Sequence, residues 1–202
     1  PRPPEERDQH QAREQRDRPP FDLRARQRRQ HISADRIVFT EFGAMKQQLD
    51  GAWAVRAPDS PLRNPDEALT LASIVEKETG KASERRTVAG VYSNRLKTGM
   101  RLQADPTVIY PVTKGKPLGR RILRSELQAD NGYNTYARAG LPAGPITNPG
   151  KEAIAAVLNP APTRYVYFVA DGTGGHVFAE TLAEHNANVE KWYAIRKSRG
   201  EM

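Results

Sequence analysis

The sequence contains no cysteine, and this absence excludes disulfides, cysteine nucleophiles and thiolate metal sites. It also lacks any apolar run near the ~20 residues that a membrane-spanning helix needs. No segment has the pattern of a signal peptide. Because the chain begins at Pro1 and not at a methionine, we expect a fragment of a longer protein whose targeting signal, if it has one, is missing.

Histidine is scarce, which bears on metal binding. His10 and His31 lie in the N-terminal segment, and His176 and His185 fall in different predicted elements. With no cysteine to complete a ligand set, the sequence predicts neither a metal site nor a cofactor. No G-x-S-x-G nucleophile pattern occurs either.

Apolar residues are also few, at 37% of the chain. The first twenty residues hold five prolines and a single apolar residue, Ala12. Such a segment buries too little apolar surface to offset its chain entropy. We therefore expect residues 1–36 to be a disordered or weakly helical basic tail, and residues 37–202 to form one folded domain.

Positive charge is in excess, with a net charge of +8. Residues 1–36 hold ten Arg against seven Asp and Glu and so supply +3, which leaves +5 for the folded part. A basic body favours an anionic partner: a nucleic acid, an anionic polysaccharide or an anionic membrane surface. The most basic stretch, KGKPLGRRILR at residues 114–124, is read either as a phosphate-binding loop or, more simply, as a solvated loop.

The pattern of apolar residues and turn formers predicts an α+β fold with a helical core, a β-hairpin and a C-terminal helix. Gly172 to Gly175 lie between two strands, not between a strand and a helix, so they are predicted to form a hairpin turn and not a phosphate loop. The expected helices cover residues 37–55, 66–79, 84–99 with Ser83 as N-cap, 106–110, 124–130, 151–160 and 182–198, and the expected strands cover residues 164–171 and 176–181.

One carboxylate on the second of these helices is the leading catalytic candidate. Leu71, Ile74, Val75 and Glu78 follow i, i+3, i+4, i+7 spacing and share one helix face. Glu78 at the end of an apolar stripe is held against the core, and desolvation raises the pKa of a carboxyl there. A raised pKa suits a general acid near neutral pH.

A simpler interpretation of Glu78 remains open. At the rim of the stripe its carboxylate could pair with Arg85 or Arg86, which follow shortly after it. Asp105 has two interpretations as well: a second carboxylate, as in glycosidases that use two, or the cap of a helix that starts at Pro106.

Tyr133, Asn134 and Tyr136 form an aromatic and amide cluster in a segment rich in Gly and Pro. Aromatic rings stack on the C–H faces of sugars and amides bind hydroxyls, which favours a sugar-binding role. The alternative is a tyrosine that merely packs a long loop.

Four segments carry a resemblance to a known family: ASIVEKET, SNRLKTGMRLQADPTVIY, GYNTYARAGLPAGPITNPG and YVYFVADGTGGHVF. In this order they resemble the signature segments of the YceG-like endolytic murein transglycosylases. The resemblance covers roughly residues 39–200. Residues 1–36 resemble no part of the family, whose members usually carry a transmembrane helix and a LysM-like domain in that region.

The resemblance implies a lysozyme-like helical core and a lytic transglycosylase that cleaves the β-1,4 bond between N-acetylmuramic acid and N-acetylglucosamine, leaving 1,6-anhydromuramoyl ends. It places the essential glutamate at Glu78. Leu102-Gln103, Tyr133-Asn134 and the Glu78-Thr79 pair resemble motifs of soluble lytic transglycosylases. The substrate-binding residues expected on this basis are Thr79, Asn94, Gln103, Asp105, Tyr133, Asn134 and Tyr136.

The family also implies a location and partners. Peptidoglycan glycan strands are the expected substrate, peptidoglycan synthases are possible partners, and the periplasmic face of the inner membrane is the expected location. Two other functions stay open: a hydrolase with Asp105 as second carboxylate, and a peptidoglycan-binding scaffold without activity. A nucleic-acid partner is not predicted, because the sequence has no recognised nucleic-acid-binding motif.

Overall fold

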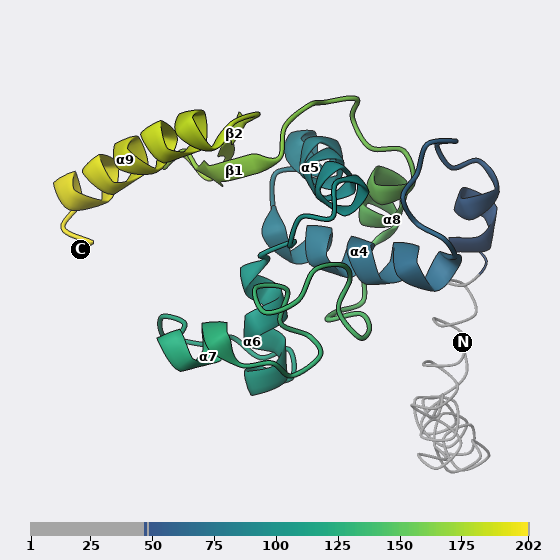
Figure 1. Cartoon of the computed structure of the whole chain (residues 1–202), viewed down its shortest axis with the longest axis horizontal. Helices are drawn as coiled ribbons and strands as arrows, with labels where there is room; N and C mark the ends of the chain where they lie inside the picture. Colours follow the sequence, from purple (N-terminus) through teal and green to yellow (C-terminus); the bar gives the residue numbers. More distant parts are fainter. Residues whose placement is uncertain (1–46, 48, 202) are drawn as a thin grey trace, which may run out of the picture. The chain divides into compact units, whose positions relative to one another are not determined.

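The computed structural model describes residues 47 and 49–201 (Figure 1). The predicted tail at residues 1–36 and the first part of the predicted helix at residues 37–55 lie outside them, and residues 49–54 are helical. The further elements are α4 (Pro65–Glu78), the 3₁₀ turn η1 (Ala82–Glu84), α5 (Arg85–Lys97), α6 (Asp105–Thr113), α7 (Arg124–Gln128), α8 (Lys151–Leu158), β1 (Tyr167–Ala170), β2 (His176–Ala179) and α9 (Leu182–Ser198).

Helix α4 begins where the sequence predicts it. The side chain of Asn64 accepts a hydrogen bond from the backbone N–H of Glu67 at 2.9 Å and so caps the helix. Pro65 occupies the first turn, where its missing N–H costs nothing. The helix ends at Glu78, close to the predicted end near Gly80.

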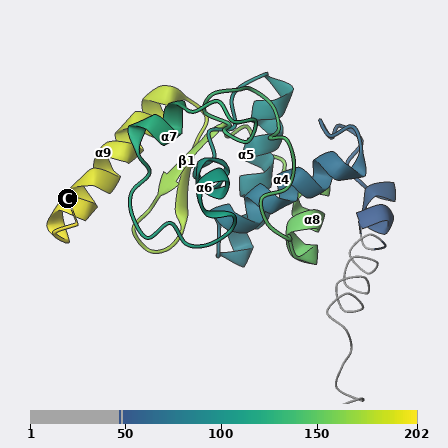
Figure 2. The same ribbon diagram turned by 90° about the horizontal axis from the view of Figure 1, so that it is seen from below.

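The core lies where α4, α5 and α8 pack against one another (Figures 1 and 2). Each helix turns its apolar stripe inward, and each large side chain buried there contributes about 1.5–3 kcal/mol. The buried core residues of these helices include Leu71, Ile74, Val75, Val88, Tyr92, Ile154, Val157 and Leu158. These three helices therefore form the hydrophobic core of the described part of the chain.

The start of α5 differs from its prediction. Ser83 is not its N-cap, because residues Ala82–Glu84 form a 3₁₀ turn and α5 starts at Arg85 without a side-chain cap. The carboxylate of Glu84 instead contacts Nδ1 of His176 at 2.9 Å. A contact with the distant hairpin thus takes the place of local capping.

An extended connector, residues 159–166, leads from α8 to the hairpin along one side of α5. Asn94 donates to the carbonyls of Thr163 at 2.8 Å and Tyr165 at 3.0 Å. Arg86 donates to the carbonyl of Asn159 at 2.9 Å. These bonds satisfy carbonyls that have no strand partner, so α5 serves as the guide for the connector.

The two strands pair antiparallel, with Phe168 opposite Phe178. This confirms the α+β class and the predicted hairpin turn, although both strands are shorter than predicted. In the turn, Asp171 accepts from the backbone N–H of Thr173 at 2.6 Å and of Gly175 at 3.0 Å, while Gly172 adopts φ 82°. Figure 1 shows α9 running alongside this hairpin.

The remaining helices depart slightly from their predicted bounds. Helix α6 starts one residue before Pro106 and continues to Thr113, and α7 ends at Gln128 instead of Asp130. None of the helices within residues 47–201 has both the length and the apolar character that a membrane crossing requires.

Replacing Gly90 tests the packing of the connector on α5. An added Cβ would lie 2.7 Å from Cγ2 of Thr163 and 2.8 Å from the carbonyl oxygen of Ala161. We expect Gly90→Ala to lower the free energy of unfolding by about 1–3 kcal/mol, because the connector must shift. Denaturant unfolding measures the change.

The matched control is Gly51→Ala. Gly51 is also helical, but its added Cβ meets nothing within 4 Å, so the gain in helix propensity should leave the protein equally or more stable. Equal stability of the two variants would contradict the packing argument.

Candidate active site

Glu78 ends α4 in contact with α5. Its predicted stripe partners Leu71, Ile74 and Val75 are fully buried, and Glu78 itself is only partly exposed. Its Oε1 accepts a hydrogen bond from the hydroxyl of Tyr92 at 2.8 Å. Tyr92 is 1% exposed, so this bond is sealed inside the helix interface.

Burial raises the pKa of Glu78 to about 7. The hydrogen bond from Tyr92 acts in the opposite direction because it favours the charged carboxylate. The charge of Asp105 adds to the increase, and the charge of Arg95 opposes it. A carboxyl with this pKa is present in both protonation states near neutral pH and can both donate and accept a proton.

The alternative interpretation of Glu78 as a member of a surface ion pair is wrong. Arg86 donates to backbone carbonyls of the connector, and no ion pair within the described residues includes Glu78. The carboxyl is therefore held by a neutral donor, which leaves its proton affinity high.

Arg95 is a buried cation beside this carboxyl, 7% exposed. Its Nε donates to the carbonyl of Val166 at 2.6 Å, and its Nη1 donates to the carbonyl of Leu102. It belongs to no ion pair in the described part of the chain. The guanidinium thus ties the connector and the segment before α6 to α5, and its charge favours ionised Glu78.

Gln103 directly follows Leu102, whose carbonyl accepts a hydrogen bond from Arg95. Its backbone adopts φ 50°, a left-handed conformation that non-glycine residues seldom take. Its side chain is exposed between the buried Leu102 and Ala104, and its N–H donates to the carbonyl of Thr135 at 3.2 Å. Backbone strain of this kind, on the order of 1–3 kcal/mol, is often found at functional sites.

Asp105 is not a helix cap, which corrects one of its two interpretations. It is the first residue of α6, whose N-cap is Ala104. Because the helix starts one residue early, the carboxylate is free to accept the hydroxyl proton of Tyr136 at 2.6 Å. Burial and this carboxylate raise the pKa of Tyr136 above its ordinary value, so its hydroxyl stays protonated.

Asn134 is 3% exposed and is used inside the protein. Its amide nitrogen donates to three backbone carbonyls, those of Glu126, Leu127 and Ala129, at 2.7–3.1 Å. Its oxygen accepts from the N–H of Tyr136 at 2.9 Å. With both ends of the amide occupied, Asn134 positions the loop that carries Tyr136.

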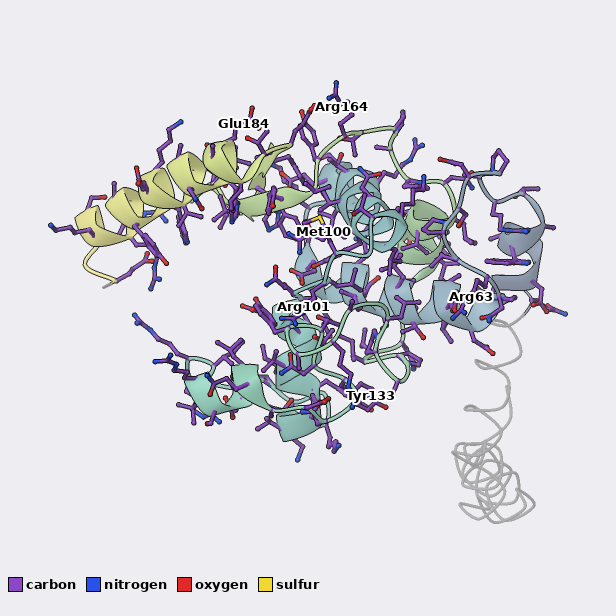
Figure 3. The ribbon with its side chains drawn as sticks, viewed as in Figure 1. Arg63, Met100, Arg101, Tyr133, Arg164 and Glu184 are labelled. Carbon is purple, nitrogen blue, oxygen red and sulfur yellow. The ribbon has the colours of Figure 1, made fainter. Side chains whose placement is uncertain are left out.

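Tyr133 lies next to this loop and remains partly exposed. Its ring packs on that of Tyr110 from α6, with centroids 5.1 Å apart. Figure 3 labels Tyr133 among the side chains. This contact fits the interpretation that Tyr133 packs its loop. Both rings stay partly exposed, so they also form an aromatic surface that a ligand can contact.

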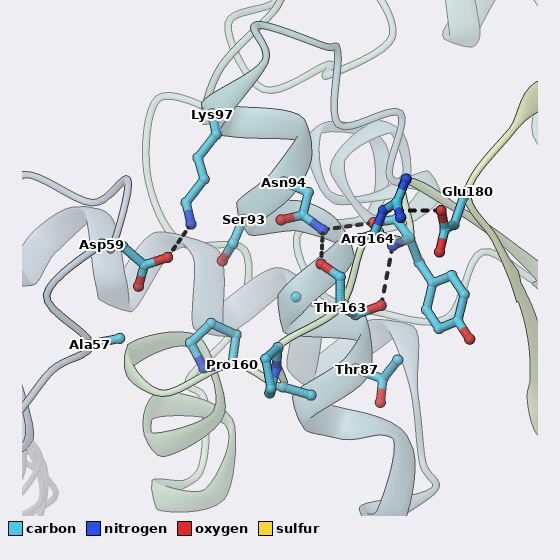
Figure 4. Close-up of a pocket in the computed structure, with 14 residues that line it drawn as sticks. Ala57, Asp59, Thr87, Ser93, Asn94, Lys97, Pro160, Thr163, Arg164 and Glu180 are labelled. Atoms are coloured by element: carbon cyan, nitrogen blue, oxygen red, sulfur yellow. Dashed lines mark hydrogen bonds and ion pairs between the residues drawn. The ribbon is translucent and has the colours of Figure 1, made fainter.

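Thr79 and Asn94 have structural partners. The hydroxyl of Thr79 accepts from the backbone N–H of Lys81 at 3.0 Å and fixes the turn after Glu78. Asn94 lines a cavity of 780 Å³ between α5 and the connector, where its amide binds the connector carbonyls (Figure 4). Glu78 is not among the residues that line this cavity, so Asn94 is separate from the Glu78 site.

Two site residues were missed by sequence reasoning, namely Tyr92 and Arg95. In the sequence, Tyr92 follows Val88 at helical spacing and fits an apolar stripe, and Arg95 stands out by no pattern. Both stand on the side of α5 that faces Glu78, three residues apart, so they follow each other on one helix face. A polar atom in an otherwise apolar stripe was the signal available for Tyr92.

The geometry defines a class of site: an α+β protein with one carboxyl of raised pKa, flanked by a buried tyrosine, a buried arginine and a second, exposed carboxylate. Within residues 47 and 49–201, no three His, Asp or Glu side chains gather closely enough to hold a metal ion.

Comparison with known proteins identifies the family. The model of the YceG-like family matches residues 27–191, so the chain belongs to the YceG-like family. The match includes residues 27–36, which corrects the expectation that the whole of residues 1–36 resembles no part of the family. It is 43% identical over 131 residues to an endolytic murein transglycosylase of Bacillus subtilis, which is 65% of this chain and 36% of the relative. It is 40% identical over 130 residues to the protein of that name from Streptococcus pneumoniae, covering 61% of this chain and 23% of the relative.

A solved structure is also similar. The crystal structure of a YceG-like protein from Listeria monocytogenes matches with a TM-score of 0.55 and 41% sequence identity, over 61% of this chain and 38% of that one. The chain thus spans between about a quarter and about two fifths of the length of the proteins it matches.

Removing the Tyr92 hydroxyl tests how the pKa of Glu78 is set. The hydrogen bond lowers that pKa, so we expect Tyr92→Phe to raise it above about 7. Carboxyl NMR titration of ¹³C-labelled glutamate measures the value. Tyr165→Phe is the matched control, because Tyr165 stacks on Phe178 at 5.7 Å and does not contact Glu78. An unchanged or lowered pKa in Tyr92→Phe would refute the assignment.

Stability against pH provides a second test. The folded-state pKa of Glu78 is about 7 and its ordinary value is 4.5, so the carboxyl destabilises the fold as pH rises between these values. Glu78→Gln removes this penalty. We expect the variant to be more stable than wild type at about pH 8, by at most roughly 3 kcal/mol, and not at about pH 4.

Denaturant midpoints at the two pH values measure this difference, with Glu190→Gln on the exposed side of α9 as control. A Glu78→Gln variant that is less stable than wild type at the higher pH would contradict the raised pKa.

Proposed function

We propose that this chain is the catalytic part of a lytic transglycosylase that acts within peptidoglycan glycan strands. It cleaves the β-1,4 bond between N-acetylmuramic acid and N-acetylglucosamine and leaves a 1,6-anhydromuramoyl end. The curated relatives carry the name endolytic murein transglycosylase, which supports this activity. Because the chain spans only part of those relatives, the activity is assigned to it as a proposal.

One observation carries the proposal: a single carboxyl whose pKa of about 7 allows both directions of proton transfer. A hydrolase that uses two carboxylates separates the acid from the base. A transglycosylase can return the proton to the group that supplied it, because the nucleophile is a hydroxyl of the substrate itself. Glu78 has the protonation balance that such a cycle requires.

The reaction proceeds in two proton transfers. Protonated Glu78 donates its proton to the glycosidic oxygen, and the bond from muramoyl C1 to that oxygen breaks. The N-acetylglucosamine residue leaves with this oxygen as its hydroxyl group. C1 acquires oxocarbenium character, which the N-acetyl group of the substrate can assist. The muramoyl 6-hydroxyl oxygen then bonds to C1, and its proton returns to Glu78. No water is consumed, and the enzyme ends in its starting state.

Tyr92 decides which carboxyl oxygen takes part. Because Oε1 accepts the bond from Tyr92, both proton transfers take place at Oε2. The charge of Arg95 stabilises the carboxylate that exists between the two transfers. Tyr92 and Arg95 are thus positioning residues that act through Glu78.

The expected substrate-binding residues divide into two groups. Gln103, Asp105, Tyr133 and Tyr136 keep exposed or partly exposed side chains, and these contact the sugar. Thr79, Asn94 and Asn134 act by holding the turn after Glu78, the connector and the loop of Tyr136. A lysozyme-like arrangement of the helical core around Glu78 is part of the same proposal.

The biological role follows from internal cleavage, which limits or ends the growth of nascent glycan strands. The periplasmic face of the inner membrane is where such strands are made, and the synthases that make them are the corresponding partners. The net charge of +8 favours association with an anionic wall polymer.

Asp105 supports a second candidate, a hydrolase. Its exposed carboxylate lies near enough to Glu78 to raise the pKa of that residue, so it could activate a water molecule. The products separate the two reactions, since hydrolysis leaves reducing ends and transglycosylation leaves anhydromuramoyl ends.

Mass spectrometry of muropeptides from purified peptidoglycan tests the proposal. We expect anhydromuramoyl products from wild type and a loss of at least about a thousandfold in Glu78→Gln, because the amide cannot donate the proton. Glu76→Gln is the control on the same helix; Glu76 accepts from the N–H of Gly150 at 3.1 Å and should be dispensable for cleavage. Reducing-end products that vanish in Asp105→Asn would establish the hydrolase instead.

A further inference from the structure

A second cavity, of 250 Å³, lies between the end of α4, α6 and the turn that follows α6. Its wall is largely apolar, with Ile109, Tyr110, Leu118 and Ile146 among the lining residues. Two lysines, Lys77 and Lys116, also line it. An apolar pocket with cations suits a ligand that has both small apolar groups and carboxylates.

Two residues of the cavity wall are sequence neighbours of residues at the Glu78 site. Lys77 directly precedes Glu78 on α4, and Pro106 of the cavity wall directly follows Asp105 on α6. Neighbouring Cα atoms are about 3.8 Å apart. A substrate that is bound at Glu78 and carries a side branch of a few residues can therefore reach the cavity.

The lysines of the cavity have no ion-pair partner among the residues that the structure describes. Neither Lys77 nor Lys116 forms an ion pair within the described residues, and both side chains are exposed. Lys114 adds a third cation, with Nζ 5.6 Å from the centre of the Tyr110 ring. Lys114 and Lys116 belong to the basic stretch of residues 114–124, which the reaction at Glu78 leaves unexplained.

We propose that this cavity is a subsite for the short acidic peptide that the muramoyl residue carries on its lactyl group. The inference rests on the proposed function and names the part of the substrate that the second cavity reads. The alanyl and lactyl methyl groups pack on Ile109 and Tyr110. The peptide carboxylates bind Lys77 and Lys116, in charge-assisted contacts that are stronger than neutral ones.

The test compares two substrates. One is uncrosslinked glycan with its peptides, and the other is the same glycan after an amidase has removed them. We expect wild type to cleave the peptide-bearing glycan with the higher kcat/KM. The double variant Lys77→Gln, Lys116→Gln should lose about tenfold in kcat/KM on that substrate and stay within about twofold of wild type on the stripped glycan.

The matched control is the double variant Lys191→Gln, Lys197→Gln. It removes the same charge from two exposed lysines of α9, and it should leave the substrate preference unchanged. An equal loss in both double variants would mean that only the net charge matters, and it would overturn the subsite. A wild type that cleaves both substrates equally would overturn it too.

A binding measurement keeps the subsite testable apart from catalysis. Titration of a synthetic muramoyl tetrapeptide into labelled protein should shift the NMR signals of Ile109 and Ile146, and the Lys77 and Lys116 substitutions should abolish the shifts. If neither glycan yields anhydromuramoyl products, the proposed function fails while this titration still decides the subsite. An absence of shifts at both isoleucines would overturn the subsite even if cleavage occurs.

Discussion

The hydrogen bond between Tyr92 and Glu78 is the interaction on which the site depends. It crosses the interface of α4 and α5, where the apolar stripes of both helices exclude water. Burial alone would raise the pKa of the carboxyl further, and the tyrosine moderates that effect while fixing one oxygen. A carboxyl that can act as acid and then as base needs this balance, because either form must be reachable near neutral pH.

Helix α5 serves both sides of this arrangement. One side presents Tyr92 and Arg95 to Glu78, and the other presents Gly90 and Asn94 to the connector that leads to the hairpin. Arg95 links the Glu78 site to the connector, because it also donates to the carbonyl of Val166, the last connector residue before the hairpin. A change in the placement of α5 would therefore alter the site and the hairpin together.

Side-chain hydrogen bonds hold the long Gly- and Pro-rich loop in place of regular structure. Asn134 bonds three carbonyls and so stands in for a missing helix or strand partner. Tyr136 then reaches Asp105, which connects the loop to the start of α6. Of the residues that resemble sugar-binding motifs, Asn134 is thus used to build the loop, whereas Tyr133 and Tyr136 stay partly exposed to a ligand.

Periodicity by itself determined helix α4, the inward face that Glu78 shares with its apolar stripe, and the hairpin, because each of these depends on residues close in sequence. Composition determined the basic charge and the lack of thiol chemistry. Only the tertiary structure decided which side chains form hydrogen bonds with Glu78 and Asp105. Tyr92 lies fourteen positions from Glu78, and Tyr136 lies 31 positions from Asp105. The predicted caps Ser83 and Asp105 do not cap α5 and α6: a 3₁₀ turn precedes α5, α6 starts one residue early, and the carboxylates of Glu84 and Asp105 bind partners far away in the sequence.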